Sequence, residues 1–288
     1  MAKELSIVGK GAFGNALRTV YQRAGFSVAQ FGRELSMRLP GEFVLLAVPS
    51  QAVSDVVRQI ECPTDQILVL CCKGLLPSGA LPSSALPASH PFAVLSGPGF
   101  ADEMQALLPT VHSLATELSA AEEIAAALST PSFRLYWSND PVGTQICGAY
   151  KNVLAIAAGI ADGLAIGENA RAALLVRGAA ELRRIISASG GQEETVWSPA
   201  GFGDLALTCT SAKSRNFRFG QIIATGESPE NAHRTLGTVE GIAALEGFVG
   251  AHRLLDTPIA TMLHRVIHGK QTPARAVQEL MQRPIKSG

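Results

Sequence analysis

Residues 9–14 read GKGAFG, and this stretch decides the fold of the first half of the chain. It follows an apolar run at residues 5–8, which predicts a strand, and it opens an amphipathic stretch at residues 15–24, which predicts a helix. Glycines at this spacing permit a tight turn, a close approach of the backbone to a diphosphate, and close packing of helix on strand. The free N–H groups at the helix start would bind that diphosphate. The motif therefore predicts dinucleotide binding, although a glycine turn without a ligand would share the pattern.

The end of the second predicted strand, at residues 27–31, indicates which dinucleotide binds. Folds that bind NAD usually place Asp or Glu there to accept a hydrogen bond from the ribose 2′-hydroxyl. This chain continues with Gly32 and Arg33 instead, and a guanidinium suits a 2′-phosphate. We therefore predict NADP as the preferred cofactor and NAD as a possible one. The alternative is that Arg33 is a surface residue paired with Glu34.

Apolar runs and amphipathic stretches alternate over the first half of the chain. Further strands are predicted at residues 43–48, 67–72, 93–95 and 133–137, and helices at 52–60 and 120–128. Strands that are apolar on both faces and separated by helices are typical of a parallel sheet covered by helices. The first half is therefore predicted to be a Rossmann-type domain of the α/β class.

The pattern changes at Pro141, after which only helical spacing is found. Helices are predicted at residues 142–164, 169–189, 218–224, 239–254 and 273–283. Asp140 is a good N-cap, and proline is favoured in the first turn that follows one. We predict a Rossmann-type parallel sheet domain at residues 1–140 and an all-α substrate domain at residues 141–288.

Composition limits the class of protein. The 24 basic and 24 acidic side chains leave no net charge that would attract nucleic acid or an anionic membrane surface. The apolar runs are too short to cross a bilayer, and the N-terminus lacks the pattern of a signal peptide. Five cysteines without a C-x-x-C motif indicate a reduced chain. We expect a cytoplasmic protein that acts on a small molecule, and the apolar helical half favours a homodimer.

Three further stretches carry a resemblance to a known family. They read SGPGFA at residues 96–101, KNVLAIAAGIADG at 151–163, and GFGDL at 201–205 followed by SRN at 214–216. With AVPSQ at residues 47–51 and Lys73-Gly74, the chain resembles bacterial NAD(P)-dependent glycerol-3-phosphate dehydrogenases over nearly its whole length. The resemblance implies a helical second domain like that of 6-phosphogluconate dehydrogenase. It also implies reduction of dihydroxyacetone phosphate to sn-glycerol 3-phosphate, which supplies glycerophospholipid synthesis.

Lys151 is the principal candidate for proton transfer. Its neighbours in the predicted helix are Ala, Ile, Val and Gly, and an ammonium buried among them is costly unless it has a purpose. A desolvated lysine has a lowered pKa and can donate a proton to a carbonyl oxygen. The alternative is a lysine whose amine reaches solvent at a domain edge. The resemblance implies that Lys151 is the general acid and base.

Other candidates come from the strand ends and from the helical half. Lys73 follows a predicted parallel strand, at the sheet edge where such folds bind ligands. Ser214, Arg215 and Asn216 offer a hydroxyl, a guanidinium and an amide, which suit a phosphate monoester. The alternative for this tripeptide is a helix N-cap followed by a solvated arginine.

The resemblance assigns these candidates to roles. The implied catalytic residues are Lys151, Lys73 and Asp204. The implied substrate contacts are Lys73, Gly97, Gly99, Lys151, Asp204, Ser214, Arg215 and Asn216. The expected cofactor contacts are Gly9, Gly11, Ala12, Phe13, Gly14, Arg33, Lys73, Ala101, Arg215 and Glu240, with Glu240 on the nicotinamide side.

Some features depart from the resemblance or compete with it. The link between residues 33 and 43 is short where relatives carry an additional strand and helix, and Gly99 stands where Ser or Thr is usual. His264 and His268 have a spacing that can hold a metal, but no third ligand is recognised, so we expect two surface histidines and no metal. Two other functions remain open: a related hydroxy-acid dehydrogenase, and an NADPH-binding protein without catalysis.

Overall fold

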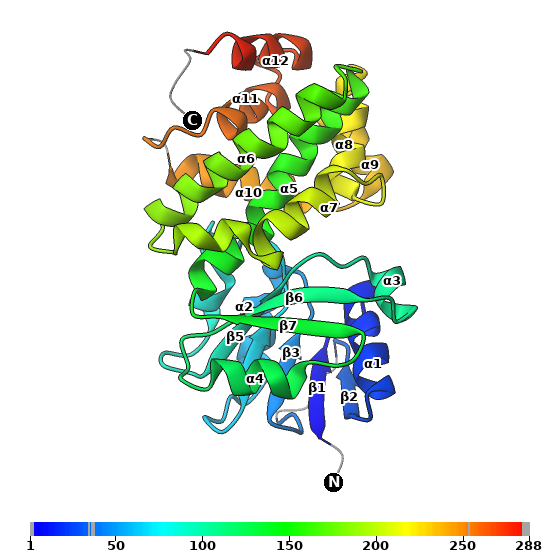
Figure 1. The fold of residues 1–288 in the computed structure, drawn as a ribbon, viewed down its shortest axis with the longest axis vertical. Helices are drawn as coiled ribbons and strands as arrows, with labels where there is room; N and C mark the ends of the chain where they lie inside the picture. Colours follow the sequence, from blue (N-terminus) through cyan, green and yellow to red (C-terminus); the bar gives the residue numbers. More distant parts are fainter. Residues whose placement is uncertain (1–2, 34, 36–37, 253, 284–288) are drawn as a thin grey trace.

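The computed structural model describes residues 3–33, 35, 38–252 and 254–283. A sheet with flanking helices forms one part of the molecule, and a bundle of helices forms the other (Figure 1). The sheet has the strand order β2-β1-β3-β4-β5-β6-β7. Its strands are β1 (Glu4–Val8), β2 (Ser27–Phe31), β3 (Phe43–Leu46), β4 (Ile67–Leu70), β5 (Phe92–Ser96), β6 (Thr110–Ala115) and β7 (Phe133–Ser138).

The central strands are buried on both faces, because successive side chains enter two different apolar clusters. Leu45 lies in the cluster with α1 (Ala12–Arg23), α3 (Ala101–Gln105) and α4 (Ala121–Leu128). Leu46 lies in the cluster with α2 (Val53–Gln59). Two short 3-10 turns, η1 (Ser50–Ala52) and η2 (Pro82–Ala85), connect this region. The predicted Rossmann-type fold is therefore confirmed.

The last two strands differ from the prediction of a parallel sheet. Strands β1 to β5 are parallel, but β6 pairs antiparallel with β5 and β7 runs parallel to β6. Strand β6 and helix α3 were not predicted. The sequence of β6, TVHSLA, is rich in polar residues and gives no apolar run.

The second half is helical, as predicted. The helices are α5 (Pro141–Gly163), α6 (Glu168–Ala188), α7 (Asp204–Cys209), α8 (Arg215–Ala224), α9 (Pro229–Leu236), α10 (Glu240–Ala251), α11 (Pro258–Ile267) and α12 (Pro273–Met281), with two turns, η3 (Glu193–Trp197) and η4 (Pro199–Gly203). The longest helix, α5, passes through the bundle and is buried along most of its length (Figure 1). None of the helices in the described ranges is long and apolar enough to cross a membrane.

Helix α5 begins at Pro141, directly after the predicted N-cap Asp140. The carboxylate of Asp140 accepts a hydrogen bond from the Gly143 N–H at 2.8 Å. Its second oxygen accepts from the Gln192 N–H at 2.9 Å and from the Thr195 hydroxyl at 2.5 Å. One buried side chain therefore caps α5 and attaches η3 to the helix start.

Strand β2 forms one edge of the sheet, and in the described residues no strand lies outside it. The described end of the segment between β2 and β3 packs against the sheet, where Leu39 joins the apolar cluster of α2. Ser6 donates to the Pro40 carbonyl at 2.6 Å, and Gln66 donates to the Leu39 carbonyl at 2.7 Å. This arrangement agrees with the expected shortening of the link, in which residues 34, 36 and 37 lie outside the described residues.

Candidate active site

The glycine loop lies at the point where the strand order reverses. The chain passes from β1 to β2 on one side and then to β3 on the other, and ligands of such sheets bind at the carboxyl ends beside this point. Gly9 has a φ of +126°, and a Cβ there would lie 2.3 Å from the Ala47 carbonyl oxygen after β3. At Gly14, a Cβ would lie 2.2 Å from the Gly9 carbonyl oxygen. Gly11 caps α1, and no described atom lies within 4 Å of the Cβ position there. The loop is therefore folded tightly and is open at the helix start.

The surroundings of the loop fit an anionic dinucleotide. Ala12 is the exposed first residue of α1, and the first turn of this helix contains no acidic residue. Gln30 occupies β2 and donates to the Gly9 carbonyl at 2.9 Å, so it holds the loop. Arg33 is exposed and makes no hydrogen bond or ion pair with a described residue. The alternative partner, Glu34, lies outside the described residues.

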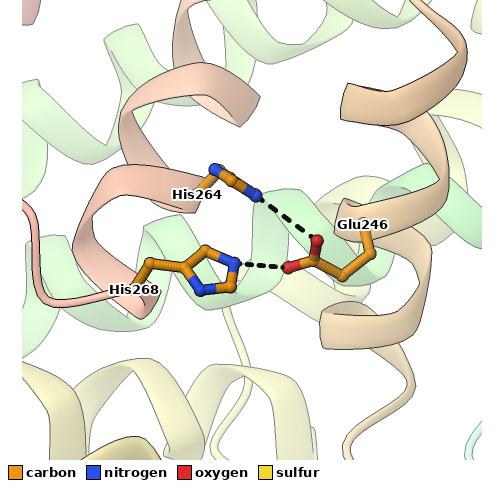
Figure 2. Close-up of side chains that lie close together, drawn as sticks. All are labelled: Glu246, His264 and His268. Carbon is orange, nitrogen blue, oxygen red and sulfur yellow. Dashed lines mark hydrogen bonds and ion pairs between the residues drawn. The ribbon is translucent and has the colours of Figure 1, made fainter.

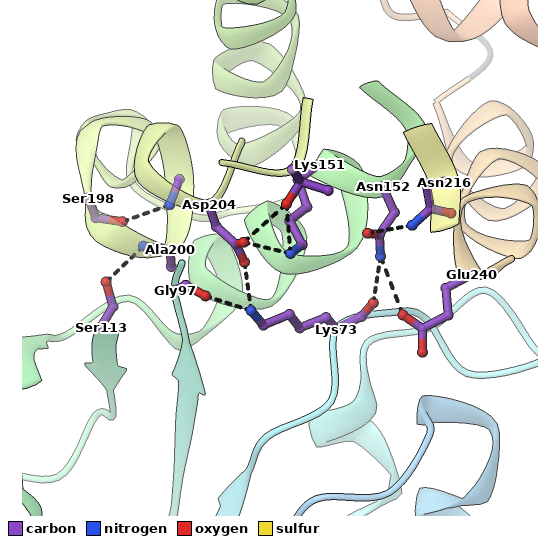
Figure 3. Close-up of polar contacts among 12 residues, drawn as sticks. Lys73, Gly97, Ser113, Lys151, Asn152, Ser198, Ala200, Asp204, Asn216 and Glu240 are labelled. Carbon is purple, nitrogen blue, oxygen red and sulfur yellow. Dashed lines mark hydrogen bonds and ion pairs between the residues drawn. The ribbon is translucent and has the colours of Figure 1, made fainter. Parts of the chain in front are cut away.

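A buried carboxylate and two ammonium groups form the centre of the site (Figure 3). Asp204 opens α7 and is 1 % exposed. One of its oxygens accepts from Lys151 Nζ at 2.6 Å, and the other accepts from Lys73 Nζ at 2.8 Å. Lys73 also donates to the Gly97 carbonyl at 2.6 Å, and Lys151 donates to the Thr208 hydroxyl at 3.2 Å. Lys73 and Gly97 come from the sheet half and the other groups come from the helical half.

The protonation of this cluster follows from burial and charge. Burial lowers the pKa of Lys151 to about 8, although the Asp204 charge opposes the shift. Burial alone would raise the pKa of Asp204, but the charges of Lys151 and Lys73 outweigh it and hold that pKa below its ordinary value. The site therefore combines a permanent carboxylate with an amine that can gain or lose a proton near neutral pH.

A second polar chain connects the lysines to helix α10. Asn152 donates to the Lys73 carbonyl at 3.0 Å and contacts the Glu240 carboxylate at 3.5 Å (Figure 3). The Asn216 side chain donates to the side-chain amide oxygen of Asn152 at 2.9 Å and accepts from the Gly241 N–H at 3.0 Å. Burial raises the pKa of Glu240, against the charges of Lys151 and nearby basic groups. Asn216 therefore holds α8 and α10 together, which the sequence analysis did not foresee.

Ser214 and Arg215 differ in their exposure. The buried hydroxyl of Ser214 accepts from the Phe217 N–H at 3.2 Å and caps α8, which matches the alternative interpretation of this tripeptide. Arg215 is exposed and makes no hydrogen bond or ion pair with a described residue. Its guanidinium is therefore free to bind a ligand beside Glu240.

The loop after β5 is shaped by a histidine that the sequence analysis missed. A Cβ at Gly97 would lie 2.7 Å from His112 Cα, and one at Gly99 would lie 2.8 Å from His112 Cε1. His112 is fully buried in β6, and neither ring nitrogen has a partner among the described residues. Burial, with the charge of Lys73, lowers its pKa to about 3. Glycine at position 99, where Ser or Thr was expected, therefore leaves space for this ring.

Two further predicted contacts lie nearby. The Phe13 ring is 6.1 Å from the His112 ring, and Lys73 Nζ lies 5.8 Å from the Phe13 ring centroid. Ala101 is the first residue of α3 and packs at the edge of the α1 cluster. The glycine loop and the lysine cluster are therefore adjacent.

The functional residues that sequence reasoning missed lie next to predicted ones. Asn152 follows Lys151, and Thr208 is one helical turn after Asp204. A position next to a predicted residue is only a weak signal that Asn152 hydrogen-bonds to Lys73 and that Thr208 hydrogen-bonds to Lys151. His112 had no signal, because its strand was not recognised.

His264 and His268 have a carboxylate partner that was not recognised in the sequence. Helix α10 places the Glu246 carboxylate between His264 and His268, at 3.3 Å and 2.9 Å from their Nε2 atoms (Figure 2). A third possible ligand, which was not recognised in the sequence, is therefore present beside this pair. The missing partner is 18 residues away from the nearer histidine in sequence, in another helix.

Comparisons with known proteins agree with the resemblance. Family models for the N-terminus and C-terminus of NAD-dependent glycerol-3-phosphate dehydrogenase match residues 40–124 and 140–278. A glycerol-3-phosphate dehydrogenase [NAD(P)+] of Rhizobium etli is 41% identical and aligns over 99% of both chains. The chain belongs to this dehydrogenase family. A relative of the same name from Synechococcus sp. is 38% identical over 99% of both chains.

Members of the glycerol-3-phosphate dehydrogenase family also share the fold. The crystal structure of the Coxiella burnetii enzyme has a TM-score of 0.87 and 33% identity, and the match covers 98% of this chain and 99% of that one. The Plasmodium falciparum glycerol-3-phosphate dehydrogenase has a TM-score of 0.84 at 18% identity, which is evidence for the fold alone. The family predicted from the sequence is thus confirmed.

Proposed function

We propose that this chain reduces dihydroxyacetone phosphate to sn-glycerol 3-phosphate, with NADPH preferred and NADH possible, and so supplies glycerophospholipid synthesis. The observation that carries the proposal is the buried amine of Lys151, 2.6 Å from Asp204 and adjacent to the glycine loop through Lys73 and Phe13. When bound, the reduced nicotinamide supplies a hydride. The chain itself must place the substrate and deliver a proton.

Lys151 delivers that proton in the proposed reaction. With a pKa of about 8, its ammonium is protonated at neutral pH and can donate to the oxygen of the former carbonyl. Lys73 stabilises the negative charge that develops on this oxygen. Asp204 holds both amines in place and lies near the resulting hydroxyl. In the reverse reaction, neutral Lys151 takes the proton back.

Arg215 anchors the phosphate group of the substrate in this proposal. Its exposed guanidinium offers paired donors, and Ser214 and Asn216 position the start of α8 beside it. Gly97 and Gly99 would contact the substrate through the backbone of the loop after β5, which Lys73 holds through the Gly97 carbonyl. Binding energy from the phosphate, remote from the reacting carbon, then orients the carbonyl.

The cofactor is held from both halves in the proposed arrangement. Arg33 would pair with a 2′-phosphate, and Arg215 and Glu240 would face the nicotinamide end. The glycine loop, with Ala12, Phe13 and Gly14, would hold the diphosphate, and Ala101 would contact the cofactor at the start of α3.

Several wider properties are part of the same proposal. The two halves are separate domains at residues 1–140 and 141–288, which the match of the C-terminal family model from residue 140 supports. The protein works in the cytoplasm as a homodimer and does not bind nucleic acid. Five free cysteines and the zero net charge support these assignments.

The test is steady-state kinetics with NADPH, followed by the absorbance of the cofactor. We expect turnover of dihydroxyacetone phosphate, and we expect Lys151→Ala to reduce kcat by roughly 10²- to 10⁴-fold. Arg215→Ala should raise KM for dihydroxyacetone phosphate by a larger factor than KM for unphosphorylated dihydroxyacetone, because only the phosphorylated substrate loses a phosphate contact. A hydroxy-acid dehydrogenase would show no effect of Arg215→Ala, and a non-catalytic protein would bind NADPH without turnover.

A further inference from the structure

We propose that Glu246, His264 and His268 bind a divalent transition-metal ion of the zinc class. The three side chains come from α10 and from the end of α11 and point toward one another (Figure 2), and none of them belongs to the proposed active site. Two imidazoles and one carboxylate are a ligand set that zinc accepts, with further positions left for water.

The distances between the ligand atoms suit one ion. Their donor atoms all lie within 4.8 Å of one another. Two ligands about 2.1 Å from an ion, at a tetrahedral angle, are roughly 3.4 Å apart. The Glu246 oxygens lie 3.3 Å from His264 Nε2 and 2.9 Å from His268 Nε2. Small side-chain rotations would therefore bring these atoms to the separation that a shared ion requires. The two rings are 4.3 Å apart between centroids and face the same carboxylate.

The helices that carry these ligands are fixed at their starts. The buried carboxylate of Glu181 accepts from the Ile259 and Ala260 N–H groups, each at 2.9 Å, and so holds the start of α11. The Gly241 N–H, at the start of α10, donates to Asn216 at 3.0 Å. A site carried by two anchored helices loses little freedom when an ion binds.

The three side chains are also accessible to an ion. The side chains of His264, His268 and Glu246 are 24%, 43% and 46% exposed. A bound ion would join α10 to α11, and α10 begins at Glu240 of the proposed active site. The ion is therefore expected to stabilise the helical half and to take no part in hydride or proton transfer.

The test uses the full chain without an affinity tag, after dialysis against a chelator, with Co²⁺ as the probe. We expect one Co²⁺ per chain, a visible absorption band, and loss of that band when Zn²⁺ is added. Glu246→Gln and His268→Ala should each weaken Co²⁺ binding by at least about tenfold. Mg²⁺ should not compete, because it prefers oxygen ligands.

His252→Ala is the matched control. His252 follows α10 and contacts Ser189 at 3.3 Å, outside the cluster, so its replacement should leave Co²⁺ binding unchanged. Circular dichroism checks that each variant folds, and His264→Ala replaces any variant that does not. The proposal is overturned if the parent chain binds no stoichiometric Co²⁺, or if the cluster variants bind it as the parent does. Either result would leave the turnover of dihydroxyacetone phosphate, and hence the proposed function, unaffected.

Discussion

Lys151 and Asp204 show how two side chains set each other's protonation. The Asp204 charge raises the pKa of Lys151 against the effect of burial, and the result is about 8. We predict that kcat/KM for reduction falls as pH rises through about 8, because the ammonium is the proton donor. In Asp204→Asn the supporting charge is lost, so the pKa of Lys151 falls and this limb of the profile moves to lower pH.

A profile of kcat/KM against pH, measured for the parent protein and for Asp204→Asn, tests this prediction. Thr208→Val is the control, because it removes a hydrogen bond to Lys151 and no charge. Superimposable profiles for the parent and Asp204→Asn would show that another group is the proton donor.

His112 explains why residue 99 is glycine. A serine side chain there would meet His112 Cε1 at 2.8 Å and Met104 Sδ at 3.1 Å. We predict that Gly99→Ser destabilises the chain by about 1–3 kcal/mol through overpacking. His112→Val makes space, so the double variant should be more stable than the sum of the two single effects. Urea unfolding of all four chains measures this coupling, and strictly additive effects would refute it.

At the scale of elements, the N-cap of α5 makes the clearest prediction. Asp140 is buried and accepts three hydrogen bonds, from Gly143, Gln192 and Thr195. We expect Asp140→Ala to lower the free energy of unfolding by about 2–4 kcal/mol, because buried donors lose their partner. Denaturant unfolding gives the value.

A surface cap provides the comparison. Ser228 is exposed and accepts from the Asn231 N–H at the start of α9. Ser228→Ala should cost only about 1 kcal/mol, as ordinary caps do. Equal losses in the two variants would mean that the additional bonds of Asp140 contribute nothing.

The elements that the sequence predicted and those that it missed differ in a physical property. Strands β3 and β4 are continuous apolar runs, and α5 and α6 are long with clear spacing. Strand β6 is buried although it contains Thr, His and Ser. Its sequence therefore lacks the apolar pattern by which a buried strand is recognised. Helices α7 and α9 have 6 and 8 residues, too few for the period to be recognised. The antiparallel direction of β6 likewise has no local signal.

The candidate site shows the same limit. Lys73, Lys151 and Asp204 could each be selected from the sequence, because their motifs or surroundings are unusual. Their arrangement could not be derived, since Asp204 is 53 residues from Lys151 and 131 from Lys73. Glu246 escaped notice beside His264 for the same reason.

At the scale of the whole molecule, the proposed cofactor contacts join the two halves. The glycine loop and Lys73 belong to the sheet half, whereas Arg215 and Glu240 belong to the helical half. We predict that NADPH raises the Tm of a single cooperative transition in calorimetry. At 100 times Kd the stabilisation should be about 2.7 kcal/mol.

Arg33→Ala is the variant that tests cofactor choice in this experiment. It should reduce the Tm shift caused by NADPH and leave the shift caused by NADH unchanged, because only NADPH carries the 2′-phosphate. Two separate transitions, of which NADPH moves only the first, would contradict binding across both halves.

Three basic side chains and two carboxylates lie close together at the junction of the halves, and one positive charge is therefore unbalanced; these groups are Lys73, Lys151, Arg215, Asp204 and Glu240. An approaching phosphorylated metabolite therefore experiences an attractive potential before it touches any residue. Salt in the surrounding solution weakens this attraction over distances near 10 Å. The rate of encounter, more than the lifetime of the complex, should then decline as salt is added.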